Sequence, residues 1–288
     1  NVTGDITYDE VVGRNLNISG IATVATLGVS VATTSKDLLV TGIATVATLE
    51  VGSNIKLGNA GVVTATSFSG SGANLTGISA GLTTDAYRNT TGGINAGDSF
   101  TSGSAEDNTL IGYDAGTAIT TGDDNTAVGS YALLTVTTGI SNSALGYSAL
   151  KINTGSYNTA LGADALQANT SASYNTAVGN QALYTNSTGS DNAAFGRQAL
   201  KLNTTGGSNT ATGNSALYSN TTGSQNVASG YSALENNTTA SNNTASGYKS
   251  LYTNTTGDNN TASGMHALLS NTTGSYNTAS GRGALRSN

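Results

Sequence analysis

The feature that most constrains this sequence is a short internal repeat in its C-terminal part. The motif N-T-A-x-G-x-x-A-L-x-x-N-T-T-G-x-x recurs in eleven consecutive copies from Asn108 onward. Successive repeat glycines lie 17 residues apart, except for one interval of 16 residues between Gly146 and Gly162. A period this short is typical of solenoids and fibrous arrays, in which a unit buries its apolar face only by stacking on its neighbours.

The repeat favours strands and turns over helices. Thr, Asn, Ser and Gly are poor helix formers, and the motif places one of them every few residues. We expect N-T-A-x and x-A-L-x to be short strands with the Gly at the bend between them, and N-T-T-G to be a turn. Two strands and two bends make one coil of a parallel β-roll, and eleven coils stacked about 4.8 Å apart give a rod of roughly 50 Å.

Three sets of repeat positions are predicted to form structural columns along this rod. The Asn four residues before each repeat Gly is expected to form a ladder of side-chain amides, and the Leu four residues after it is expected to form the core with the Ala columns. The predicted ladder asparagines are Asn125, Asn142, Asn158, Asn175, Asn192 and Asn209, the bend glycines are Gly129, Gly146, Gly162, Gly179, Gly196 and Gly213, and the core leucines are Leu150, Leu166, Leu183, Leu200 and Leu217.

The position just before the repeat Gly changes character along the chain. It is occupied in turn by Ile111, Val128, Leu145, Leu161, Val178, Phe195, Thr212, Ser229, Ser246, Ser263 and Ser280. Because this position alternates with the buried Ala of its strand, we expect it to face away from the coil interior. Its apolar half predicts contact with a sister chain, and the alternative is simple variation on a solvated face.

The N-terminal third follows a different pattern. The string GIATVATL occurs at 20–27 and again at 42–49, and its Ile, Val and Thr residues favour strands. We therefore expect residues 1–84 to form a slender intertwined β shaft or attachment segment. Residues 85–107 are irregular and acidic and are predicted to be a junction, followed by the β-roll over residues 108–288.

Composition argues against several partners. The chain has 288 residues, of which 9% are charged, and its formal net charge is −6. The ten Lys and Arg residues are scattered singly, which disfavours nucleic acid as a partner. No apolar run approaches the roughly 20 residues that cross a bilayer, so we expect no membrane insertion. The chain has no Cys, which excludes disulfides and thiolate metal sites.

Residues able to support catalysis are few. His266 is the only histidine, and no Ser has a base placed by the repeat to activate it. Carboxylates that could form a glycosidase pair gather near the start of the repeats, at Glu106, Asp107, Asp114, Asp123 and Asp124. An acidic junction of this kind is more often solvated than catalytic. We therefore expect no catalytic, cofactor-binding or metal-binding residues, no cofactor and no enzymatic activity.

Tyrosines recur at two repeat positions, directly after the repeat Leu and directly after the repeat Gly. Tyr184, Tyr218 and Tyr252 each follow the repeat Leu, in alternate coils. Exposed rings in such a row are candidates for stacking on glycans, whereas buried rings would only stiffen the rod.

These motifs resemble known fibrous proteins. The repeat N-T-A-V-G…A-L…N-T-T-G resembles the head repeat of YadA-type trimeric autotransporter adhesins and, more closely, repeats of phage tail-fibre proteins. VTGDITYDEVVG at 2–13, the paired GIATVATL and VVTATSFSGSGANLTGI at 62–78 resemble shaft segments of fibres from marine cyanophages. The adhesin repeat is usually a little shorter than the repeat of this chain.

The resemblance implies a parallel homotrimer located in a virion, as a tail fibre or similar appendage that supports host recognition and adsorption. The implied partners are sister chains, other tail, baseplate or capsid proteins, and a host surface glycan or protein. A bacterial trimeric surface adhesin, located on the cell surface, is the first alternative. A polysaccharide-degrading tail spike is the second.

Overall fold

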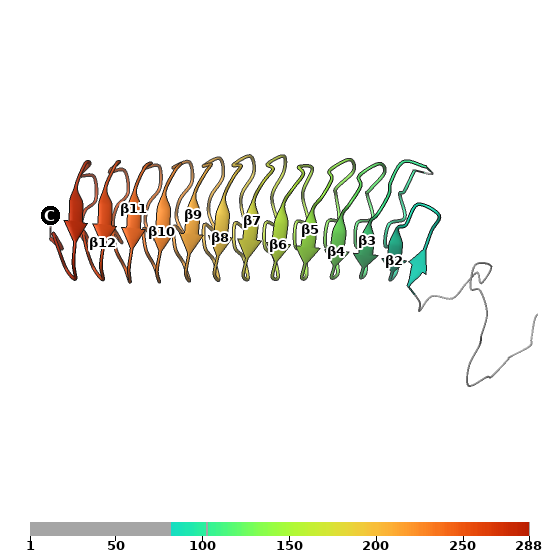
Figure 1. Ribbon diagram of the computed structural model, residues 1–288, viewed down its shortest axis with the longest axis horizontal. Helices are drawn as coiled ribbons and strands as arrows, with labels where there is room; N and C mark the ends of the chain where they lie inside the picture. The colour runs from blue at the N-terminus through green and yellow to red at the C-terminus, as the bar shows by residue number, and fades with distance from the viewer. Residues whose placement is uncertain (1–81, 102, 288) are drawn as a thin grey trace, which may run out of the picture. The chain divides into compact units, whose positions relative to one another are not determined.

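Figure 1 shows the computed structural model, which describes residues 82–101 and 103–287. The predicted shaft over 1–84 therefore lies outside the described residues except for its last three. In the described part the elements are short strands and turns, without a helix. The strands are β1 (Thr83–Thr84), β2 (Thr90–Gly92), β3 (Thr109–Ile111), β4 (Thr126–Val128), β5 (Ser143–Leu145), β6 (Thr159–Leu161), β7 (Thr176–Val178), β8 (Ala193–Phe195), β9 (Thr210–Thr212), β10 (Val227–Ser229), β11 (Thr244–Ser246), β12 (Thr261–Ser263) and β13 (Thr278–Ser280).

The strands form one sheet in which chain order and spatial order coincide. β1 pairs with β2 in antiparallel fashion, and from β2 to β13 each strand pairs in parallel with the next. The register is strict, since equivalent repeat positions face each other, as Ala177 faces Ala194. Figure 1 shows the consequence, a row of coils in which the arrows of β2 to β13 all point the same way. The predicted all-β parallel solenoid with a repeat of about 17 residues is therefore confirmed.

Each coil contains one strand, where the sequence pattern predicted two. N-T-A-x is extended, but x-A-L-x is not, because its Leu adopts a left-handed backbone, with φ of 50° at Leu183 and 51° at Leu200. A positive φ bends the chain and costs a non-glycine residue about 1–2 kcal/mol. Full burial of a leucine side chain contributes about 1.5–3 kcal/mol, which offsets that strain. The bend turns each leucine into the interior.

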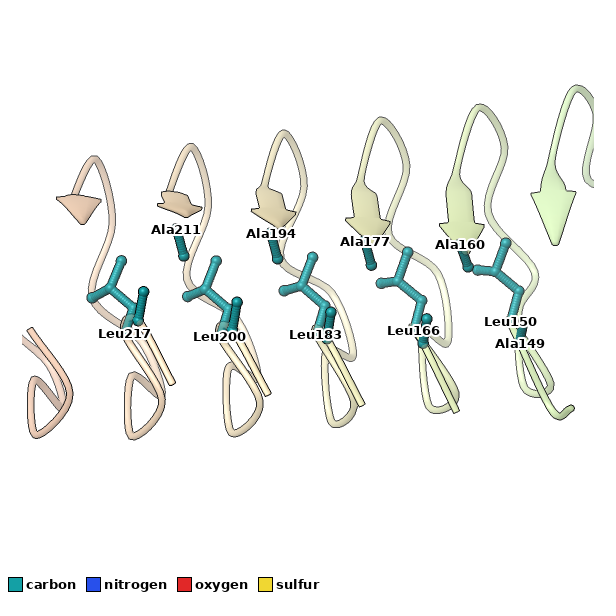
Figure 2. Close-up of a cluster of buried hydrophobic side chains, with 14 of the residues drawn as sticks. Ala149, Leu150, Ala160, Leu166, Ala177, Leu183, Ala194, Leu200, Ala211 and Leu217 are labelled. Atoms are coloured by element: carbon teal, nitrogen blue, oxygen red, sulfur yellow. The ribbon is translucent and has the colours of Figure 1, made fainter. Parts of the chain in front are cut away.

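The core consists of columns of leucine and alanine side chains that run along the solenoid. Figure 2 shows leucines from successive coils stacked on one another, with the strand alanines facing them. Leu183 and Ala177 are both fully buried, as are their counterparts in neighbouring coils. Each coil contributes two buried alanines and one buried leucine, such as Ala177, Ala182 and Leu183, so its apolar interior is narrow. The predicted core leucines all lie in these columns.

The one short coil keeps the strand register. The missing residue falls in the N-T-T-G turn, which is shortened to N-T-G at residues 153–155. Ser143 still faces Thr159, and Ala144 still faces Ala160. A turn at the edge of the coil therefore absorbs the deletion, and the columns continue through it.

The solenoid begins before Asn108, inside the segment assigned to a junction. β2 pairs in parallel with β3, and the Oδ1 of Asn89 accepts the N–H of Asn108 at 3.0 Å. Gly93 follows Asn89 by four residues, with the same positive φ as the repeat glycines. The interval from Asn89 to Asn108 is 19 residues, which conceals this coil in the sequence pattern.

Candidate functional site

The predicted asparagines form one buried column, which we call the first asparagine ladder. Its main rung runs from backbone to side chain: the N–H of Asn192 donates to Oδ1 of Asn175 at 3.0 Å, and that of Asn209 donates to Oδ1 of Asn192 at 3.0 Å. The Nδ2 of Asn192 donates to the carbonyl of Gly206 at 2.9 Å. Through its backbone N–H and its side chain, each asparagine thus bonds to the coil before it and to the coil after it. Its side-chain oxygen and nitrogen are both paired. Equivalent rungs begin at Asn125, Asn142, Asn158 and Asn175.

A second asparagine ladder was not anticipated from the sequence. The Nδ2 of Asn203 donates to Oδ1 of Asn186 at 2.7 Å and to the carbonyl of Gly206 at 2.8 Å. The members of this column are all buried: Asn153, Asn169, Asn186, Asn203, Asn220, Asn237, Asn254 and Asn271. Ile119 and Val136 fill the same position in the two earlier coils. In the sequence this ladder is visible as the recurring Asn of N-T-T-G. The preference of Asn for turns explained its recurrence without burial.

The glycine column fixes how closely the coils approach. Gly179 has a φ of 131°, and a Cβ built on it would lie 2.6 Å from the backbone carbonyl carbon and oxygen of Gly196. The other predicted bend glycines have the same conformation and similar approaches of 2.5–2.8 Å. Only glycine combines this φ with a neighbouring backbone at that distance. Glycine is therefore required at this position for the spacing of the coils.

The position before the repeat Gly faces outward, as its alternation with the strand alanine predicted. Within the single chain Leu145 is 49% exposed, and Leu161 and Phe195 are each 42% exposed. Ile111, Val128 and Val178 are half-buried. We call these six residues the apolar stripe. From Thr212 onward the same position is polar and exposed.

The tyrosines that follow the repeat Leu are half-buried. The Nζ of Lys201 lies between two of them, 6.0 Å from the ring centre of Tyr184 and 5.7 Å from that of Tyr218. The Nζ of Lys249 lies 4.8 Å from the ring centre of Tyr252. These distances are those of cation–π contacts. The three predicted rings therefore hold lysine side chains, and one face of each is occupied.

More exposed rings lie one residue after the repeat Gly. Tyr231 and Tyr248 are 52% and 44% exposed and stack with ring centres 5.5 Å apart. In earlier coils Tyr113 and Tyr147 each pack edge-on against Tyr131, with ring centres 5.5 and 5.8 Å away. Burial of Tyr131, together with its neighbours Tyr113 and Asp114, raises the pKa of its hydroxyl.

The carboxylates near the first coil serve structural contacts. Arg88 donates to Glu106 at 2.8 Å and to Asp107 at 2.6 and 2.7 Å. This contact lowers the pKa of Asp107 and raises that of Arg88. The Oδ1 of Asp123 accepts the backbone N–H of Glu106 at 2.9 Å.

The histidine and carboxylate side chains of residues 82–101 and 103–287 form no group of three or more that could hold a metal ion. The same residues contain no helix long and apolar enough to cross a membrane.

These features define the molecule, over its described residues, as a parallel β-solenoid whose coils are joined by backbone pairing and two internal asparagine ladders. No protein-family model, no curated protein and no solved structure matches this sequence.

Proposed function

We propose that this chain is a rod-forming component of a virion appendage, such as a tail fibre, and that it assembles as a parallel homotrimer. Its role is mechanical: it holds an adsorption module at a fixed distance from the particle. The strict register and the two asparagine ladders support a rod that resists bending, because each coil is bound to the next by backbone and side-chain hydrogen bonds. The resemblance of its motifs to phage fibre segments supports the assignment to a virion.

The observation that carries the trimer is the apolar stripe. Leu145, Leu161 and Phe195 are large side chains that are 42–49% exposed in the single chain, and the sheet register aligns them in one row. Contiguous exposed apolar rows are uncommon on monomers and mark contact surfaces. A parallel sister chain presents the same row at the same height, so its stripe can cover this one. The polar second half of the column needs no cover.

The native mass and shape of the purified chain test this proposal. We expect analytical ultracentrifugation to give an elongated particle with three times the 28.5 kDa mass of the chain. Leu145→Ser, Leu161→Ser and Phe195→Ser combined should release monomers that keep the β-sheet signal. The matched control changes Thr212, Ser246 and Ser263 to Ala in the polar half of the same column, and it should remain trimeric. A wild-type protein that is a compact monomer would contradict the proposal.

A bacterial surface adhesin is the second candidate function, favoured by the exposed aromatic rings of Tyr231 and Tyr248. In this case the solenoid itself would contact host matrix or other cells. Labelling with an antibody against the chain discriminates the two candidates: an appendage protein labels virions, whereas an adhesin labels the bacterial cell surface.

A further inference from the structure

The charges of the solenoid are sorted between the two edges of the coils. Two groups of turns form these edges, the loops that follow each strand arrow and the loops that precede it (Figure 1). We call the first group the basic edge and define it as the residues one and two after each repeat Gly and the residue after each repeat Leu. From Gly146 to the end of the described chain it carries six cations: Lys151, Arg197, Lys201, Lys249, Arg282 and Arg286.

The basic edge has more cations than carboxylates, whereas the opposite edge has carboxylates and no cations. Over the same stretch the basic edge contains two acidic residues, Asp164 and Glu235. The opposite edge, made of the two residues before each ladder Asn, carries Asp191 and Asp258 there and no Lys or Arg. Cations that look scattered along the sequence therefore share one surface, because the repeat returns their positions to the same side of the rod.

The three positions of the basic edge are in contact. The Nζ of Lys249 lies 5.6 Å from the ring centre of Tyr248 and 4.8 Å from that of Tyr252. Lys151 lies 5.3 Å from the ring centre of Tyr131 in the preceding coil. Tyrosine rings thus hold three ammonium groups in place, which reduces the conformational entropy that they would lose on binding an anion.

These six cations are not neutralised by the chain. In residues 82–101 and 103–287 the ion pairs are those of Arg88 with Glu106 and Asp107, near the start of the solenoid. The basic edge thus has a surplus of positive charge on a chain whose net charge is −6. This surplus of positive charge lies on one edge, among exposed aromatic rings. It fits an anionic ligand that can also pack against the rings.

The spacing of the cations selects the type of anionic polymer. Lys151, the Arg197–Lys201 pair and Lys249 lie three coils apart, which is about 14 Å at the usual spacing of strands. A nucleic acid strand carries a charge roughly every 3.4 Å when helical, and its recognition uses dense Lys and Arg. A polysaccharide with sparse carboxylate or sulfate groups matches the wide spacing, and its neutral sugars can stack on tyrosine rings between the cations.

We infer that the basic edge binds a linear anionic polysaccharide along the rod. Lys201 and Lys249 contact its acidic groups, and the exposed parts of the stacked Tyr231 and Tyr248 rings pack against the sugars between them. The half-buried Tyr184, Tyr218 and Tyr252 orient the lysines. The inference does not depend on the trimer or on a virion location, because every group that it uses belongs to one chain.

The test measures binding of the purified full chain to hyaluronan, which carries one carboxylate per disaccharide, by affinity electrophoresis and calorimetry. Neutral dextran and single-stranded oligothymidine are the comparison polymers. We expect hyaluronan to bind most tightly, with an affinity that falls as salt rises. Lys201→Ala with Lys249→Ala should weaken binding by about tenfold or more, and Tyr231→Ala with Tyr248→Ala by a similar factor.

The matched control is the stacked pair of Tyr157 and Tyr174 on the opposite edge, whose ring centres are 5.1 Å apart. Tyr157→Ala with Tyr174→Ala should leave the affinity unchanged. Equal binding of dextran, tighter binding of oligothymidine, or no binding of hyaluronan would each overturn the inference. The ultracentrifugation result is independent of all three, so failure of the trimer and failure of this site are distinguishable.

Discussion

Glycine and leucine at the repeat positions solve opposite conformational problems. Gly179 needs its positive φ and also its missing side chain, because the backbone of Gly196 occupies the space where a Cβ would be. Leu183 also has a positive φ, but its side chain points into the core and recovers the cost through burial. A positive φ therefore serves two purposes in each coil. At the glycine it allows adjacent coils to approach closely, and at the leucine it directs the side chain into the core.

The glycine column allows a test that separates the cost of the backbone conformation from the cost of a clash between adjacent coils. Gly179→Ala should destabilise the solenoid strongly, by roughly 3 kcal/mol or more, since backbone strain adds to a clash with an adjacent coil. Gly281 has a φ of 114° but no atom within 4 Å of the position that an added Cβ would take, so Gly281→Ala should cost only about 1–2 kcal/mol. Urea unfolding followed by circular dichroism measures both. Equal losses would show that the close approach does not matter.

Among the elements, the first coil contains the two carboxylates of the described residues whose pKa values are lowered, Asp85 and Asp107. The Asp85 carboxylate accepts the N–H groups of Tyr87 and Asn89 and the Nδ2 of Asn89, each at 2.9 Å. Partial burial works to raise the pKa of Asp85, but these hydrogen bonds outweigh it and the net pKa lies below the ordinary 3.8. The pKa of Asp107 is likewise lowered by Arg88.

This arrangement predicts that the first coil opens at acid pH before the rest of the solenoid. A carboxylate with a lowered pKa in the folded state stabilises it above the unfolded pKa, and this stabilisation is lost as pH falls through the folded value, below 3.8. Hydrogen exchange at pH 6 and pH 3, corrected for intrinsic rates, should show lost protection in residues 85–92 and retained protection in β9 (Thr210–Thr212). In Asp85→Asn the difference between the two pH values should shrink. Uniform protection at pH 3 would refute the prediction.

At the scale of the whole molecule, stability is distributed over equivalent interfaces between neighbouring coils. Each coil contacts only the one before and the one after, through strand pairing, the two ladders and the leucine line. Stability in such an array is close to a sum of unit and interface contributions. The length of the rod can therefore change while its cross-section stays the same.

Removal of one whole repeat should accordingly be tolerated. Deletion of residues 192–208 joins Asp191 to Asn209 and preserves every column, so the thermal midpoint should fall by only about 5 °C or less. Deletion of residues 200–208 removes about half a coil and puts each later column out of register, and it should cost far more. Thermal unfolding followed by circular dichroism compares the two. Equal losses would mean that the coils are not interchangeable units.

The sequence by itself determined the period, the all-β class and the residues that form columns. A 17-residue repeat can bury its Leu and Ala only by stacking in register, so Asn192, Gly196 and Leu200 had to align with their counterparts. The outward direction of Phe195 followed equally from strand alternation. These conclusions need only local periodicity.

The tertiary structure decided what depends on distances between coils. The left-handed leucine, which removes the second strand, is favoured only because the interior of the coil is there to receive its side chain. The burial of Asn203 in a second ladder requires the neighbouring Asn186 at 2.7 Å, and no property of a single N-T-T-G turn reveals that neighbour. Six isolated cations share one edge only because the coil returns their positions to the same side. Each of these features arises from contacts between coils, whose geometry the repeat period alone does not specify.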